Sequence, residues 1–171
     1  MGGFLTVLKQ FLYRIFLGFV PLCFNSLNML LVGNLPPLGC ACVIVEDQGR
    51  FLLLKRPRSR IWNGFVFPGG FMRWREYPAE TAQREFREET GLEVRLLNTT
   101  GTYVDKSTRF NRMSTLTIAF AGEVVGGTLR SGGVEGRPCW LDEFETRALL
   151  GDHYTNMLDD YLVYREQRKQ S

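Results

Sequence analysis

The sequence predicts an α/β domain in which helices cover a mixed sheet, an α/β/α sandwich, preceded by an apolar helical extension. Three observations lead to this fold class. Runs of β-branched and apolar residues stand on both sides of a helical stretch near residues 78–90. A second helical pattern closes the chain. Residues 1–35 are dominated by apolar side chains and are followed by Pro36 and Pro37, so we divide the chain into an extension, residues 1–37, and a domain, residues 38–171.

Length, charge and cysteine usage limit the class of protein. The 171 residues suffice for one domain with a substantial core plus the extension. A net charge of +3 is too small to indicate a nucleic-acid polymer as partner. The four cysteines form no C-x-x-C pair and the single histidine is His153, which argues against a zinc site. We expect buried free thiols in a reducing cytoplasm, and therefore a cytoplasmic protein.

The extension has the composition of an interfacial helix. Between Phe4 and Phe24 most residues are Phe, Leu, Ile or Val, and Lys9 and Arg14 lie on a narrow polar stripe. The uninterrupted apolar run, residues 15–24, is about half of the ~20 residues that a transmembrane helix needs. Residues 1–35 are therefore expected to bind a membrane surface peripherally. The alternative is a helical hairpin that folds over the domain or over a partner subunit, as in a homodimer.

The domain is expected to begin with a hairpin. Residues 39–46 are small and β-branched and predict a buried strand, residues 47–49 a turn, and residues 51–55 the returning strand. A basic loop, residues 55–60, follows. Residues 62–70 then lead to a pair of glycines, where the backbone is able to approach phosphate closely.

Residues 70–92 predict loop, helix, loop. Pro78 suits the first turn of a helix, Ala82 and Phe86 supply an apolar stripe, and Gly91 is the expected C-cap. The helix carries three glutamates at positions i, i+3 and i+4, which share one face: Glu85, Glu88 and Glu89. Clustered carboxylates repel one another unless solvent, protonation or a cation relieves the repulsion, and they suit a hard ion such as Mg²⁺ or Mn²⁺. The other interpretation is a solvated acidic helix face.

The remainder predicts strands and then helices. Strands are expected at residues 93–104, 112–124 and 138–141, with a turn at Gly126-Gly127 and a flexible loop at residues 131–136. A helix should start at residues 142–144, and a C-terminal helix should cover residues 154–168. Its inward side chains are expected to be Met157, Leu158, Tyr161 and Leu162.

The stretch from Gly70 to Leu92, which we call the box, satisfies the pattern G-x5-E-x7-R-E-U-x-E-E-x-G-U, where U is a bulky apolar residue. It resembles the signature of the Nudix hydrolases, which split a nucleoside diphosphate linked to another moiety, and the resemblance extends over about residues 38–171. It implies the Nudix α/β/α sandwich and a divalent-metal-dependent pyrophosphohydrolase. It also implies that the Gly69 carbonyl joins the three helix glutamates at the metal. Before Glu76, the family more usually has a glycine than Arg75.

The resemblance assigns further roles. Glu85 is expected to be catalytic, while Arg84, which should not share the helix face of Glu85, should pair with Glu76 and hold loop and helix in register. The general base is either Glu85 or Glu135, because some relatives use a glutamate from a later loop. The substrate-binding residues stay unknown.

The substrate is expected to be a nucleotide-type small molecule: a nucleoside triphosphate, a nucleotide sugar or a dinucleotide. The proline expected after the box in ADP-ribose hydrolases is absent, and Ser107-Thr108 lies there instead. The alternative function is a catalytically weak nucleotide-binding module, or a membrane-recruited interaction module, on the same fold.

Overall fold

The computed structural model describes residues 19–33, 35–56, 64–106, 113–133 and 136–170. The chain forms two compact units: residues 39–103 with 116–171, and residues 1–38 with 104–115. Each unit is described by itself. The boundary expected between residues 37 and 38 stays a prediction.

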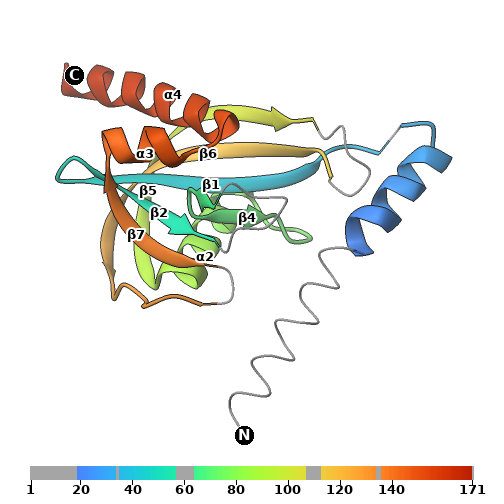
Figure 1. Ribbon diagram of the computed structural model, residues 1–171, viewed down its shortest axis with the longest axis horizontal. Helices are drawn as coiled ribbons and strands as arrows, with labels where there is room; N and C mark the ends of the chain where they lie inside the picture. Colours follow the sequence, from blue (N-terminus) through green and yellow to red (C-terminus); the bar gives the residue numbers. More distant parts are fainter. Residues whose placement is uncertain (1–18, 34, 57–63, 107–112, 134–135, 171) are drawn as a thin grey trace, which may run out of the picture. The chain divides into compact units, whose positions relative to one another are not determined.

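The larger unit is built on a seven-stranded sheet, in which β3, β2, β1, β6 and β5 lie side by side in that order (Figure 1). Of the two remaining strands, β4 pairs with β1 and β7 pairs with β2. The strands are β1 (Leu38–Asp47), β2 (Arg50–Lys55), β3 (Phe65–Val66), β4 (Gly69–Phe71), β5 (Leu92–Asp105), β6 (Thr115–Gly127) and β7 (Arg137–Asp142). The helices are α2 (Pro78–Thr90), α3 (Glu143–Leu149) and α4 (Asp152–Lys169).

The hairpin that opens the domain is confirmed. Asp47 faces Arg50 across the β1–β2 pair, so only Gln48 and Gly49 form the turn. Both have positive φ, 50° and 75°, which is the requirement of a two-residue turn that matches strand twist.

Alternate residues of β1 face opposite helices, which makes the unit a sandwich (Figure 1). On one face the core joins Cys42 and Ile44 to α4 through Met157, Leu158 and Tyr161. On the other face it joins Ala41, Val43 and Val45 to α2 through Ala82 and Phe86. The predicted fold class and the predicted inner faces of both helices are thus confirmed.

The ends of α2 follow its sequence. The Tyr77 N–H donates to the Glu80 carboxylate at 2.9 Å, and Pro78 occupies the first turn. Gly91 ends the helix with φ of 78°, and its N–H donates to the Arg87 carbonyl at 2.9 Å. A Cβ at Gly91 would lie 2.5 Å from the Thr128 carbonyl oxygen, so no larger residue fits this C-cap.

Two expectations were wrong. Gly126 and Gly127 belong to β6 and form no turn, because Gly127, with φ of 89°, lies against the start of β5 where a Cβ would be 2.7 Å from the Leu92 Cα. The cysteines are free but not uniformly buried: Cys23 is exposed and Cys42 is buried. Burial raises the pKa of the Cys42 thiol to about 12, so this cysteine is an inert core residue.

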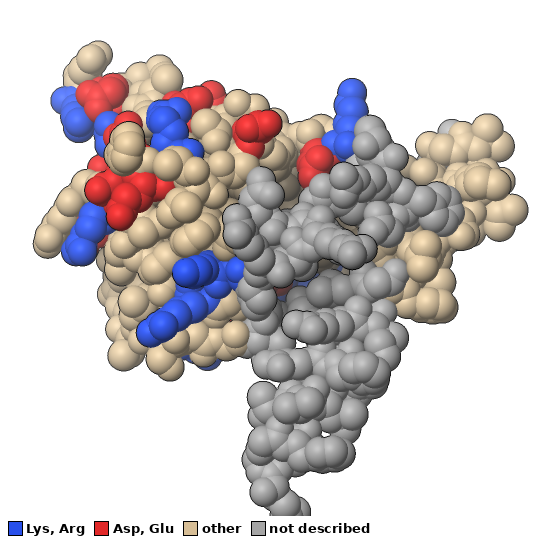
Figure 2. All heavy atoms as spheres, in the orientation of Figure 1, with Lys and Arg blue, Asp and Glu red and all other residues tan. Residues whose placement is uncertain are grey.

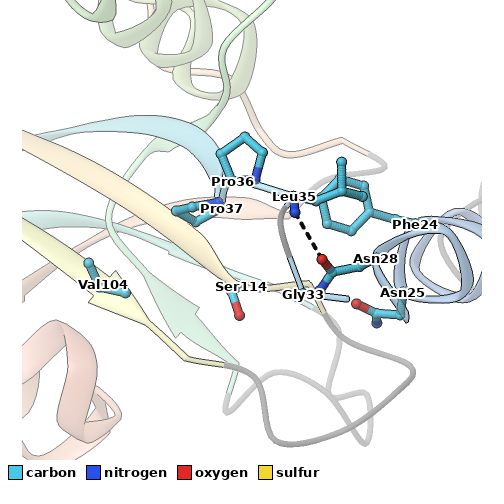
Figure 3. Close-up of a pocket in the computed structure, with 9 residues that line it drawn as sticks. All are labelled: Phe24, Asn25, Asn28, Gly33, Leu35, Pro36, Pro37, Val104 and Ser114. Carbon is cyan, nitrogen blue, oxygen red and sulfur yellow. Dashed lines mark hydrogen bonds between the residues drawn. The ribbon is translucent and has the colours of Figure 1, made fainter. Parts of the chain in front are cut away.

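In the smaller unit, residues 19–30 are helical. The helix ends where the Gly33 N–H donates to the Asn28 carbonyl at 2.8 Å, while the Asn28 side chain accepts from the Leu35 N–H at 3.0 Å (Figure 3). A cavity of about 250 Å³ lies beside this helix end, lined by Phe24, Asn25, Asn28, Gly33, Leu35, Pro36, Pro37, Val104 and Ser114 (Figure 3). No helix within the described residues is long and apolar enough to cross a membrane.

Candidate active site

Glu89 anchors the C-terminal half of α2 to the sheet. Its carboxylate accepts the Arg56 guanidinium at 2.7 Å on one oxygen and the Gly69 N–H at 2.8 Å on the other. The Glu89 side chain is 1% exposed, so both contacts are made away from bulk water. The end of β2, the start of β4 and the end of the box helix meet at this carboxylate.

Glu85 lies directly on the backbone of β4. A Cβ placed on Gly70 would be 2.6 Å from the Glu85 carboxyl carbon and 2.8 Å from each of its oxygens. The bare Cα of Gly70 therefore provides the space in which this carboxylate sits, which gives a steric reason for the first glycine of the box.

Arg84 joins the loop to the helix. It donates to Glu76 through Nε at 2.6 Å and through Nη2 at 2.8 Å. Glu76 also accepts from the Arg73 N–H and the Thr81 hydroxyl. These hydrogen bonds lower the pKa of Glu76 to about 2, and the hydrogen bond from Arg84 has the largest effect. The expected pair is present, and its importance for catalysis stays a prediction.

Arg84 was expected not to share the helix face of Glu85, yet the two side chains are in contact. Nη1 of Arg84 donates to Glu85 at 2.5 Å and lies 3.4 Å from Glu88. The side chain is long enough to bend across the helix surface, so adjacency along the chain does not separate the two groups. Glu88 is about half exposed and lies 3.3 Å from Arg73.

Arg75 stands where the family more usually has a glycine. Its φ is 65°, in the left-handed region that favours glycine. A glycine is more usual in the family at this position because the backbone there has this conformation. The side chain is exposed beside two exposed aromatic residues, Trp74 and Tyr77.

Two arginines of this region were missed by the reasoning from sequence. Arg56 was seen only as part of a basic loop, and Arg130 was not singled out. Arg130 donates to the Glu88 carbonyl at 2.6 Å and so satisfies an end-of-helix acceptor of α2. Both contacts join segments far apart in sequence, and no local spacing signals them.

Glu135 lies outside the described residues. Among the described residues on either side of it, the Gly133 N–H donates to the Gly136 carbonyl at 2.8 Å. Whether Glu85 or Glu135 is the general base stays a prediction.

The carboxylates of this site are of a ligand type that suits a divalent cation. Among the residues that the structure describes, no three Asp, Glu, His or Cys side chains are arranged around one point; the glutamates of the box are turned to arginines instead. Four carboxylates contact three guanidinium groups, Arg56, Arg73 and Arg84, and a fourth guanidinium, that of Arg130, donates to the Glu88 carbonyl. Carboxylate oxygens are the donors that suit Mg²⁺ or Mn²⁺.

Charges elsewhere on the larger unit are mixed. Over α3 and α4, basic and acidic side chains alternate on the face that Figure 2 shows. Arg147 pairs with Asp159 at 2.7 Å, and Arg165 pairs with Glu46 at 3.0 Å.

The larger unit is thus an α/β/α sandwich in which a glycine-led loop and one helix bring glutamates and arginines together. Comparison with known proteins agrees: the family model of the NUDIX domain matches residues 35–157. The chain belongs to the Nudix hydrolase family and is an enzyme of that class.

Individual relatives support this assignment. An ADP-ribose pyrophosphatase of Methanocaldococcus jannaschii is 30% identical over 122 residues, which cover 71% of each chain. A CMP-5'-(N-acetyl-N-hydroxy-3-aminopropyl)phosphonate hydrolase of Streptomyces rubellomurinus is 36% identical over 92 residues, 52% of this chain and 44% of that protein. A NUDIX hydrolase from Nitrosomonas europaea shares the fold with a TM-score of 0.65 at 23% identity, covering 75% of this chain and 90% of that one.

Proposed function

We propose that this chain is a divalent-metal-dependent pyrophosphohydrolase that cleaves a nucleoside diphosphate linked to another moiety. The observation that carries the proposal is the convergence of the box on β4, where Glu85 occupies the space above Gly70 and Glu89 is bonded to Gly69. A binding module has no need of this set of buried and half-buried carboxylates beside a glycine backbone.

The residues of the site have separate roles in this proposal. Glu85, Glu88, Glu89 and the Gly69 carbonyl would hold Mg²⁺ or Mn²⁺, which when bound offsets phosphate charge and lowers the pKa of a water. Glu85 or Glu135 would serve as the general base. Arg84, held by Glu76, fixes the helix against the loop and positions Glu85.

One relative is named an ADP-ribose pyrophosphatase, so ADP-ribose is the first substrate to test, even though the proline expected in ADP-ribose hydrolases is absent from this chain. Nucleoside triphosphates and dinucleotides complete the panel. The alternative, a catalytically weak nucleotide-binding or membrane-recruited module, would bind members of the panel in calorimetry without turning them over.

The decisive experiment compares two variants of similar chemistry. Glu89→Gln should lose at least ~100-fold in turnover with Mg²⁺, because metal and water activation supply several kcal/mol. Glu46→Gln removes another ion-paired carboxylate of this unit, 15% exposed and bonded to Arg165, and should retain activity. Wild-type turnover in a folded Glu89→Gln variant, with Mg²⁺ as the only metal, would refute the assignment.

We also propose that residues 1–35 attach the enzyme peripherally to a membrane surface or to a second copy of the chain. Large apolar side chains of the described helix and of the turn that follows it face solvent, including Phe19, Met29, Leu30 and Val32 at 63–86% exposure. Contact with anionic lipid should weaken with salt without vanishing.

Vesicle co-sedimentation and solution mass of the full chain and of a chain lacking residues 1–37 test this proposal. The full chain should pellet with anionic vesicles or form dimers, and the shortened one should do neither while remaining active. Two unbound, monomeric proteins, with the shortened one unfolded, would mean that the segment belongs to the core.

A further inference from the structure

We infer that Arg56 is an internal counter-ion of Glu89 whose charge opposes a divalent cation at the same carboxylate, so that Arg56 sets the metal affinity of the site. The inference rests on the proposed function, because it takes Glu89 as a metal ligand. It assigns a role to a residue that neither the box nor its spacing identifies.

The first step is geometric. Arg56 is the residue that follows β2, and its own N–H donates to the Gly64 carbonyl at 2.6 Å, which fixes the backbone from which the side chain extends. From there Nη2 reaches Glu89 Oε1 at 2.7 Å, across 33 positions of sequence. The two side chains are 21% and 1% exposed.

The second step is electrostatic. A carboxylate with so little exposure is costly to ionise without a cationic partner, and Arg56 supplies one. A Mg²⁺ or Mn²⁺ ion bound at Glu89 would sit about 2 Å from the same carboxylate. Two positive centres would then lie within roughly 5 Å of each other in a region of low solvent exposure, where their repulsion is screened little. The Arg56 contact therefore opposes metal binding, whereas the neutral Gly69 N–H on the other oxygen does not.

The third step separates Arg56 from the other arginines of the site. Arg84 contacts Glu85, but two of its hydrogen bonds go to Glu76, so this cation keeps a carboxylate partner when Glu85 turns to a metal. Arg73 reaches Glu88 at 3.3 Å, where both side chains are about half exposed or more, so water replaces the contact at little cost. Arg56, by contrast, donates to the buried carboxylate of Glu89 at 2.7 Å.

The test measures metal affinity without substrate. In the full chain at pH 8, Mn²⁺ binding is titrated by the loss of the free-ion electron paramagnetic resonance signal. Arg56→Met removes the cation and should bind Mn²⁺ at least ~10-fold more tightly, because the carboxylate is left without its counter-ion. Arg56→Lys retains the charge and should bind as the wild type does. Arg165→Met breaks the comparable pair with Glu46 and should change nothing.

A second readout protects the test against a folding defect. Without metal, Arg56→Met should melt below the wild type, and Mn²⁺ should raise its melting temperature by more than it raises that of the wild type. If Arg56→Met does not fold, Arg56→Gln, which keeps a neutral N–H donor for Glu89, replaces it in the same titration.

The outcomes separate the two proposals. Equal or weaker Mn²⁺ binding in the neutral variants, with an active wild type, overturns the role of Arg56 and leaves the hydrolase assignment intact. If the wild type and the variants neither bind Mn²⁺ nor hydrolyse any substrate of the panel, both the role of Arg56 and the hydrolase assignment are wrong. Tight binding by Arg56→Met, unchanged binding by Arg56→Lys and an active wild type support both.

Discussion

Replacing Gly70 by alanine should damage the chemistry far more than the fold. The new Cβ would lie 2.6 Å from the Glu85 carboxyl carbon, and an ordinary van der Waals contact begins at 3.4 Å, so the carboxylate must retreat by about 0.8 Å. The group that has to move is the end of a flexible side chain, which makes the steric cost of the substitution small. We expect a loss of stability of about 1 kcal/mol or less.

The catalytic effect of the same displacement is large. A misplacement of about 1 Å in a catalytic site costs ~100-fold, so a retreat of this size should lower turnover between ~10-fold and ~100-fold. Turnover is measured on the best substrate of the panel with saturating Mg²⁺, and stability by urea denaturation.

Gly69→Ala is the matched control. Its Cβ would meet backbone: the Ala41 carbonyl oxygen, and the Cys42 Cα at 2.6 Å. Backbone in a paired strand cannot retreat as a side chain does, so this variant should unfold readily and lose activity with stability. If Gly70→Ala instead keeps full turnover, or loses as much stability as Gly69→Ala, then the space above Gly70 does not place Glu85 for catalysis.

Three further predictions concern the loop residues. Because its pKa is lowered to about 2 from 4.5, chiefly by the Arg84 hydrogen bond, Glu76 stabilises the fold fully above about pH 4.5 and loses that effect as the pH falls toward 2. Glu76→Gln should therefore lower the free energy of unfolding by about 1 kcal/mol at pH 7 and by almost nothing at pH 2. If urea denaturation gives the same difference between variant and wild type at both pH values, this prediction is wrong. Arg75→Gly should leave stability unchanged or raise it by up to about 1 kcal/mol, because φ is 65° there, whereas a lower melting temperature would show that the side chain matters. Glu135→Gln should lower the rate and remove the acidic limb of the pH–rate profile if Glu135 is the base, and an unaltered profile assigns that task elsewhere.

Most of the fold was predictable because local rules agree with one another. The helix from Pro78 to Thr90 combined a proline start, an apolar stripe and a glycine end, and the structure has all three. The error at Gly126-Gly127 has a tertiary cause. A glycine pair usually signals a turn, but here the absence of a side chain lets β6 lie against the first residues of β5.

The site was predictable only in its sequence-local part. The spacing of Glu85, Glu88 and Glu89 followed from helix periodicity, and the Arg84–Glu76 pair followed from the family pattern. The Arg56–Glu89 contact could not be foreseen, because it depends on where the end of β2 lies relative to α2. Spacing in one element says nothing about a partner contributed by another.

The geometry gives a physical reason for the spacing of the box. Glu76 directly precedes the N-cap residue Tyr77. Arg84 follows Tyr77 by seven residues, very nearly two helical turns, so Arg84 lies on the side of the helix where the chain enters it beside Glu76. Helix side chains lean toward the N-terminus, which carries the Arg84 guanidinium back to Glu76 and leaves Nη1 against Glu85. One residue more or fewer between Glu76 and Arg84 would turn the arginine by about 100° and break both contacts. An insertion of one alanine after Tyr77 should therefore abolish activity, whereas one after Lys169, at the exposed end of α4, should be tolerated better; equal activity in the two insertions would show that the spacing has another cause.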